Sequence, residues 1–478
     1  MSAGAYDTLI QGAMVVTPDG EQALDVGLTG GRIEALMPSG SAAKANKSID
    51  ATGLHLLPGT IDIHFHIRAP AFPERSTVET ETRAAAAGGV TTLFEMPLSK
   101  PCCASADQIA MRRQHFSEHA FVNFGLYGAP GDLSLEGMQA MADEGAVAFK
   151  IFTTPAPEGR ADEFGGLAFP DEADQMEALH QAGRVGLPIV VHAESAELLA
   201  YCGEQVATLD PSLAVTHGAS RPDYVEAVAV AKLLTMNTKA RAKLHIAHVT
   251  SAATVDVLRR FKGSSDFSAE TCPQYLFRTE EDVERAGVFG KVNPPIRTQA
   301  DQDAIWSAVA DGTIAHVTTD HAVFALAEKL ASAHNFLTAP PGTPGVEFML
   351  LALLNAVNQR RLSLSKAVAL VAGNGARRFG LPSKGAIVEG ADADLVLVNL
   401  SGNTVIDKNR LMTKARDLCQ LYEGMRFSAS IERTLVAGEI VFDRGKIVGK
   451  RGFGQAVRPQ HATSSPLRSP RTKAGVTR

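Results

Sequence analysis

The sequence predicts an α/β protein with a TIM-like (β/α)8 barrel and a small β-sandwich domain formed from both chain ends. From Leu56 onward, apolar strand-like runs alternate with longer helix-competent stretches, a pattern typical of parallel strands closed into a barrel. Before Leu56 and after Gly390, short alternating runs separated by turns are typical of antiparallel strands. We therefore expect β-sandwich segments at 1–55 and 386–452, and the barrel at 56–385.

The terminal segments carry turn residues between their apolar runs. Pro18-Asp19-Gly20 and Gly30-Gly31 separate the first runs, which predicts a small antiparallel sheet at the start of the chain. A similar pattern of short apolar runs and turn residues returns after Gly390. One accessory domain built from both chain ends is therefore the simplest account. The strand candidates are 14–16, 24–28, 33–36, 394–398, 431–436 and 439–442.

The barrel segment contains eight strand candidates, which is the number that a closed (β/α)8 barrel requires. They lie at 56–63, 91–96, 121–127, 146–152, 188–192, 243–248, 268–271 and 315–319. Ala-rich helical stretches separate them, among them 79–87, 173–183, 224–234, 252–261 and 299–310.

Composition excludes several classes of protein. The 478 residues are 45% hydrophobic and 21% charged, which favours a globular protein with a large core. A formal net charge of −6 argues against nucleic acid as the main partner, and no apolar run of about 18 residues predicts a membrane span. No secretory signal is visible, and the five cysteines fit no disulfide framework, so we expect reduced thiols in the cytoplasm.

The last residues differ in composition from the rest of the chain. From Lys450 onward there is no acidic residue, and proline and serine are frequent. We expect a disordered basic tail at 453–478, solvated rather than bound to nucleic acid.

The strongest chemical signal is His64-Phe65-His66 in the first barrel strand. Side chains alternate faces along a strand, so His64 and His66 point the same way, toward the mouth where barrel enzymes place their active sites. Two such imidazoles form half of a metal site. Alone, the pair could be two surface histidines.

Four further residues follow at the ends of later strands. Lys150, His192, His248 and Asp320 each stand at or near the end of a strand candidate, and their joint occurrence in this order is hard to assign to chance. Each one alone could be a structural polar residue. An ammonium at position 150 would be unfavourable beside metal cations.

The chain resembles the amidohydrolase superfamily, specifically its cyclic amidases: hydantoinase, dihydropyrimidinase, allantoinase and dihydroorotase. The resemblance covers roughly residues 5–450 and is specific as a set. Its motifs are the HxH strand, Arg83 to Thr92, Glu270-Thr271-Cys272-Pro273-Gln274-Tyr275, Asn293-Pro294-Pro295-Ile296-Arg297, Gly342 to Glu347, and Gly390-Ala391-Asp392-Ala393-Asp394-Leu395.

The resemblance implies two divalent metal ions, zinc by family. His64, His66 and Asp320 would hold one ion, and His192 and His248 the other. Lys150, carbamylated by CO2, would bridge both as an anion, which removes the charge conflict. A metal-bridging hydroxide would attack the ring carbonyl of a small cyclic amide, with Asp320 as catalytic proton shuttle. Relatives also imply a homodimer or homotetramer.

Departures from the family patterns leave the ring unidentified. Arg68 matches a carboxylate-binding arginine of dihydroorotases, but Leu98 and Phe324 stand where their asparagine and histidine are expected. Met96-Pro97-Leu98-Ser99 resembles allantoinase, whereas later motifs resemble hydantoinase. Pro155 replaces the tyrosine oxyanion donor of hydantoinases, and Pro341 replaces an asparagine. The segment 154–169 is expected to form a loop over the mouth.

Three residues are candidate substrate contacts. Arg68 either binds substrate or forms an ion pair behind the site, and Asn293 either faces the substrate or caps a turn. His321 either bonds substrate or orients Asp320. His245 lies on the opposite strand face and is expected to be structural. Cys102-Cys103 is expected to be a buried pair of thiols rather than part of the pocket.

Three readings compete. The favoured one is a metal-dependent hydrolase that opens a cyclic amide, imide or ureide ring, with dihydroorotase as the alternative substrate class. A non-catalytic scaffold on the same fold is disfavoured because no ligand is lost. Deamination, which usually uses one metal without the lysine, is disfavoured by Lys150.

Overall fold

The computed structural model describes residues 5–460. Its larger sheet runs β13-β12-β11-β10-β9-β8-β7-β6-β14 with every pairing parallel. Because only three residues separate β13 from β14, the sheet closes into a (β/α)8 barrel, as predicted. The strands are β6 (Thr60–His66), β7 (Val90–Glu95), β8 (Asn123–Gly128), β9 (Ala146–Phe152), β10 (Pro188–His192), β11 (Lys243–Ile246), β12 (Phe267–Thr271), β13 (His316–Val317) and β14 (His321–Ala322).

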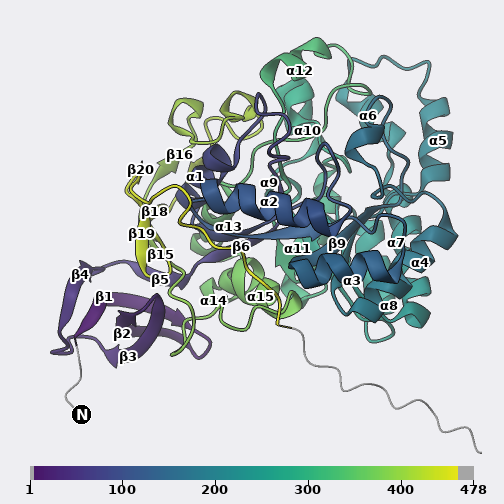
Figure 1. Ribbon diagram of the computed structural model, residues 1–478. Helices are drawn as coiled ribbons and strands as arrows, with labels where there is room; N and C mark the ends of the chain where they lie inside the picture. The colour runs from purple at the N-terminus through teal and green to yellow at the C-terminus, as the bar shows by residue number, and fades with distance from the viewer. Residues whose placement is uncertain (1–4, 461–478) are drawn as a thin grey trace, which may run out of the picture.

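Helices surround this barrel (Figure 1). Four of the five predicted helical stretches agree with the structure within two residues, whereas the one at 224–234 continues to Ala240. Helix α8 begins directly after Ser251, whose hydroxyl accepts from the backbone N–H of Thr254. The helices between strands include α1 (Val78–Ala87), α2 (Ala106–His119), α3 (Leu135–Glu144), α4 (Glu172–Val185), α7 (Asp223–Ala240), α8 (Ala252–Phe261) and α11 (Gln299–Asp311). Shorter helices near the mouth include α5 (Ala196–Gln205), α6 (Ala214–Ser220) and α12 (Leu326–Ala331).

The accessory domain is built from both chain ends, as predicted. The purple N-terminal and yellow C-terminal strands lie side by side in Figure 1. They form one sheet of order β20-β19-β18-β15-β5-β1-β2-β3, with β4 paired to β1. Its strands are β1 (Tyr6–Thr17), β2 (Gly20–Thr29), β3 (Arg32–Pro38), β4 (Ala45–Asp50), β5 (His55–Pro58), β15 (Leu395–Asn399), β18 (Ser430–Val436), β19 (Glu439–Asp443) and β20 (Lys446–Ile447).

Two local expectations about this domain are wrong. The N-terminal sheet is mixed rather than antiparallel, because β4 and β5 run parallel to β1. The expected single strand at 56–63 is also divided at Gly59, with β5 in the accessory sheet and β6 in the barrel. A side chain at Gly59 would come within 2.2 Å of Thr91, so glycine allows the chain to pass closely between the two sheets.

Part of the expected disordered tail is ordered. Residues 453–460 run beside β8, where Phe124 donates its backbone N–H to the Gln455 carbonyl and Val457 donates to that of Phe124. Gly454 lies so close to Val122 that a Cβ would meet the carbonyl oxygen at 1.9 Å. These backbone hydrogen bonds explain why a polar segment is held here. The remainder of the expected tail, 461–478, lies outside the described residues.

The barrel interior is packed and places polar side chains near the mouth. Along β9, Phe149 and Ile151 are buried in the main hydrophobic core, which the surrounding helices share. Lys150 falls between them on the opposite face of the strand, which points into the barrel. The whole of β6, β7 and β10 is buried. In the described residues, no helix is both long and apolar enough to cross a membrane.

Candidate metal centre

Five predicted ligands line one cavity of about 390 Å³ at the carboxyl ends of the barrel strands. Two come from β6, one ends β10, one follows β11 and one lies between β13 and β14. They are His64, His66, His192, His248 and Asp320.

The distances between these groups suit a metal site. Oδ1 of Asp320 lies 3.3 Å from Nε2 of His64 and 3.3 Å from Nε2 of His66. One ligand atom from each of these three residues lies within 4.8 Å of the others, which is the spacing of ligands around one cation. Beside them, Nδ1 of His192 lies 3.0 Å from Nε2 of His248.

The backbone is unusual at three of the cavity residues. Arg68, His248 and Asp320 have φ of 63°, 35° and 46°, in the left-handed region that residues other than glycine rarely adopt. Such conformations cost about 1–3 kcal/mol each and cluster at functional sites. Here all three carry side chains that line the cavity.

Lys150 is fully buried, and its Nζ atom has no hydrogen-bond partner among the described residues. Burial lowers its pKa to about 8, because a charged ammonium is poorly solvated there. Its positive charge in turn lowers the pKa of the four cavity histidines, although burial is the larger cause for each. An unpaired lysine beside four neutral imidazoles is chemically suited to become an anionic ligand.

Buried carboxylates behind the ligands hold two of the rings in place. Glu270 binds Nδ1 of His64 with one oxygen and lies 2.9 Å from Nε2 of His245 with the other. Oε2 of Glu194 lies 2.7 Å from Nε2 of His192. Carboxylates in this position fix the orientation of metal-binding histidines. His245 is therefore structural, as expected from its strand face.

Neither carboxylate was assigned a role from the sequence, although Glu270 stands in a motif noted above. Glu270 is the penultimate residue of β12 and Glu194 follows β10 by two residues, positions that place carboxylates near the barrel mouth. A position near the end of a strand is the sequence signal that could have identified these two carboxylates. Arg160 and Arg221, which also line the cavity, come from loops and carried no such signal.

The three candidate substrate contacts have different surroundings. Arg68 lines the cavity; its Nη1 donates to the Val323 carbonyl at 3.0 Å, and the guanidinium lies 4.4 Å from the Phe324 ring centroid. Within the described chain it forms no ion pair, so the ion-pair alternative is not observed. Asn293 also lines the cavity, and its Oδ1 is buried without a hydrogen-bond partner among the described residues.

His321 is placed differently from the prediction. It is fully buried, its Nε2 lies 2.9 Å from Oε2 of Glu81, and its Nδ1 accepts the backbone N–H of Gly345. Its ring stacks on Phe65 at a centroid distance of 4.6 Å. With both ring nitrogens occupied and no surface on the cavity, His321 is a structural residue and not a substrate contact.

Three residues that depart from the patterns noted in the sequence analysis lie in the wall of the cavity. Leu98, Pro155 and Pro341 all line it, so none of these positions offers a side-chain donor. The segment 154–169 contributes Thr154 to Pro157, Arg160 and Phe164, and therefore lies at the mouth as expected. Cys102 and Cys103 are buried behind the wall and do not line the cavity.

Comparison with known proteins fits this geometry. Residues 55–441 match the model of the amidohydrolase family. The chain belongs to the amidohydrolase family. Among related members, the allantoinase of Solibacter usitatus is 34% identical over 96% of this chain and 98% of its own length. The D-hydantoinase of Rhizobium radiobacter is 31% identical over 94% and 98%.

Among solved amidohydrolase structures, the L-hydantoinase (dihydropyrimidinase) of Arthrobacter aurescens is similar to this one. The TM-score is 0.90 at 28% identity, covering 95% of this chain and all of the other. Amidohydrolases generally bind divalent metals, and the cluster of His64, His66 and Asp320 is the candidate site in this member of the family.

Proposed function

We propose that this amidohydrolase opens the ring of a small cyclic amide, imide or ureide by metal-dependent hydrolysis. The observation that carries the proposal is the convergence of five predicted ligands on one cavity, with the orphaned Lys150 amine buried beside them. The likeness to allantoinases and hydantoinases along nearly the whole chain supports the same reaction class.

The donor set fits two divalent ions, for which we propose zinc. His64, His66 and Asp320 would hold one ion, and His192 and His248 the other. Carbamylation of the neutral Lys150 amine by CO2, with release of one proton, would give a singly charged carbamate whose two oxygens could serve as ligands to both ions. Imidazole and carboxylate ligands suit zinc, and neutral imidazoles need no deprotonation before binding. When bound, the ions supply Lewis acidity, which acidifies water and polarises a carbonyl.

Side chains of the protein would then transfer protons and position the substrate. Asp320 lies between the two β6 histidines and is only partly exposed, so it can take a proton from the attacking water and deliver it to the ring nitrogen that leaves. Burial raises its pKa, which suits a carboxylate that is protonated transiently. Arg68 and Asn293 face the cavity and are the proposed substrate contacts.

The substrate class is a ring of the hydantoin or allantoin type. The dihydroorotase alternative is less favoured, because Leu98 lines the cavity where an asparagine would be needed and Phe324 is stacked against Arg68. We keep a homodimer or homotetramer as the expected assembly, which light scattering on the purified protein tests.

A substrate panel tests the proposal. Metal-loaded protein is assayed with hydantoin, dihydrouracil, allantoin, dihydroorotate and succinimide, and the ring-opened acid is measured by mass spectrometry. We expect turnover of at least one cyclic ureide and little turnover of dihydroorotate. Absence of turnover for every ring, from protein with full metal content, would contradict the proposal.

A further inference from the structure

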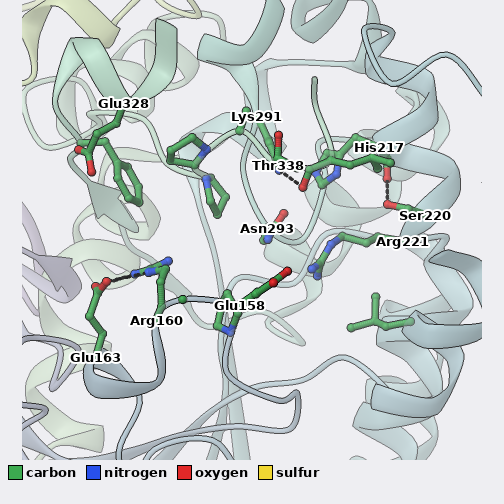
Figure 2. Close-up of a pocket in the computed structure, with 18 of the residues that line it drawn as sticks. Glu158, Arg160, Glu163, His217, Ser220, Arg221, Lys291, Asn293, Glu328 and Thr338 are labelled. Carbon is green, nitrogen blue, oxygen red and sulfur yellow. Dashed lines mark hydrogen bonds and ion pairs between the residues drawn. The ribbon is translucent and has the colours of Figure 1, made fainter. Parts of the chain in front are cut away.

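A second cavity, of about 730 Å³, lies directly outside the candidate metal centre (Figure 2). The two cavities share lining residues, so the outer one has room for a substituent on a ring held near the metal site. The shared residues are Pro157, Arg160, Leu199, Arg221, Asn293 and Pro341.

The acidic groups on one side of this outer cavity are already neutralised. Figure 2 shows the pair formed by Arg160 and Glu163, which is 2.7 Å long. Nearby, Glu328 is bound by Arg75 at 2.6 Å. Asp162 is likewise bound by Lys100, at 3.0 Å. This side therefore presents little net charge to a ligand.

The opposite side carries a lysine without a counterion. Lys291 is 3% exposed, and its Nζ donates to the Leu337 carbonyl at 3.1 Å. No carboxylate among the described residues lies within 4.0 Å of that nitrogen. Burial, with Arg221 and Lys329 nearby, lowers the pKa of Lys291 to about 6. At neutral pH the amine is therefore largely uncharged in the empty cavity, and an arriving carboxylate binds it together with a proton, because the ion pair stabilises the ammonium.

Two further groups face the same space as Lys291. Arg221 binds the buried Glu194 and still lines both cavities. Asn293 lies between Lys291 and Arg221 in Figure 2 and has an unpartnered buried Oδ1. Its amide nitrogen can donate to an acceptor in the cavity.

A carboxylate of the chain already reaches toward this space. Glu158, from the loop at 154–169, extends toward Arg221 and Asn293 in Figure 2. It is exposed and within the described chain forms no ion pair, so it can be displaced. Its position indicates that the space between the cations accommodates a carboxylate.

We propose that this chain prefers rings whose substituent ends in a carboxylate, which Lys291 and Arg221 bind in the outer cavity. This inference rests on the proposed ring-opening function and names its substrate class more closely. Glu158 acts as a competing carboxylate from the chain itself.

The test compares two hydantoins of equal size, one with a 2-carboxyethyl and one with a 2-carbamoylethyl substituent at C5, each as separate enantiomers. Charge-assisted hydrogen bonds are about twice as strong as neutral ones, so we expect kcat/KM to favour the carboxylate about 10-fold or more. In Lys291→Met this ratio falls severalfold, mainly through KM, while Arg221 retains part of the preference. Glu158→Gln raises the ratio, because the competitor is removed.

Lys100→Met is the matched control, because it removes a lysine of the same cavity that is already paired. In this variant the ratio of kcat/KM for the two hydantoins should equal that of the wild type. Equal turnover of both hydantoins by the wild type, or a ratio unchanged in folded Lys291→Met, overturns the inference. If Lys291→Met does not fold, a ratio that Glu158→Gln leaves unchanged overturns it instead. Turnover of neither hydantoin, nor of any neutral ring, counts against the proposed function and not against this preference alone.

Discussion

Glu270 binds the Nδ1 atom of His64, the ring nitrogen that faces away from Asp320. This contact leaves Nε2 of His64 directed at the candidate metal position. The same carboxylate reaches His245, so a single buried group on β12 holds two rings. Ligand orientation in this site therefore depends on a residue that does not touch the cavity.

Glu270→Gln should weaken metal binding without unfolding the barrel. Loss of the negative charge lowers the basicity of His64, and such changes typically cost about 10–100-fold in metal affinity. Zinc titration against a competing chelator measures this. Glu226→Gln is the matched control: Glu226 is equally buried but contacts Thr250 and Arg297. Equal affinity in both variants would contradict an orienting role for Glu270.

Lys150→Ala should abolish binding of one of the two metal equivalents and lower kcat by at least about 100-fold, since metal ions contribute several kcal/mol to such reactions. Added short carboxylates should restore part of the activity by replacing the carbamate. Metal content and turnover are measured together. Lys329→Met provides the control, because Lys329 is also buried but, among the described residues, donates only to the Val288 carbonyl. Two bound equivalents in Lys150→Ala would count against a bridging lysine.

The buried carboxyl group of Glu347 should make the free energy of unfolding depend on pH. Burial raises its pKa to about 8, although it accepts backbone N–H groups of Met412 and Thr413. The folded pKa lies above the unfolded one, so the folded chain holds this proton more tightly. Its stabilising contribution is complete at low pH and is lost as pH rises from about 5 to 8, by up to about 1 kcal/mol per pH unit.

Glu347→Gln should remove that dependence while keeping an acceptor for the two N–H groups. The difference in apparent Tm between variant and wild type is measured at several pH values from 5 to 8. We expect the variant to gain relative stability as pH rises. A difference that does not change with pH would show that Glu347 is ionised throughout.

The ordered segment 453–460 should contribute to stability. A chain ending at Gly452 lacks the hydrogen bonds from this segment to Ala120, Asn123 and Phe124, each of which contributes about 0.5–1.5 kcal/mol. Its apparent Tm should fall by a few degrees below that of a chain ending at Gln460. Equal Tm values would mean that the contacts beside β8 are dispensable.

Much of the barrel could be predicted from sequence because parallel strands are buried on both faces and appear as short apolar runs. The runs at 146–152 and 188–192 coincide with β9 and β10. The division at Gly59 was not predicted in this way, since strand-like residues stand on both sides of Pro58-Gly59 with no loop between them. Its cause is a close approach to Thr91, a contact far along the chain.

The metal ligands were predictable because each lies at or near the carboxyl end of a strand, where a polar side chain after an apolar run is conspicuous. The substrate contacts were harder to predict from the sequence. His321 stands beside Asp320 in sequence, but left-handed backbone at Asp320 turns the two side chains to different surroundings. Arg221 and Lys291 come from loops, and only the folded chain places them around one cavity.

Metal-dependent ring opening is tested most directly by reconstitution. Metal-free protein receives zero, one or two equivalents of zinc with bicarbonate, and the opening of allantoin and hydantoin is measured at each loading. We predict no turnover without metal and the highest turnover of at least one ring at two equivalents. Turnover that is the same with and without metal would contradict the account.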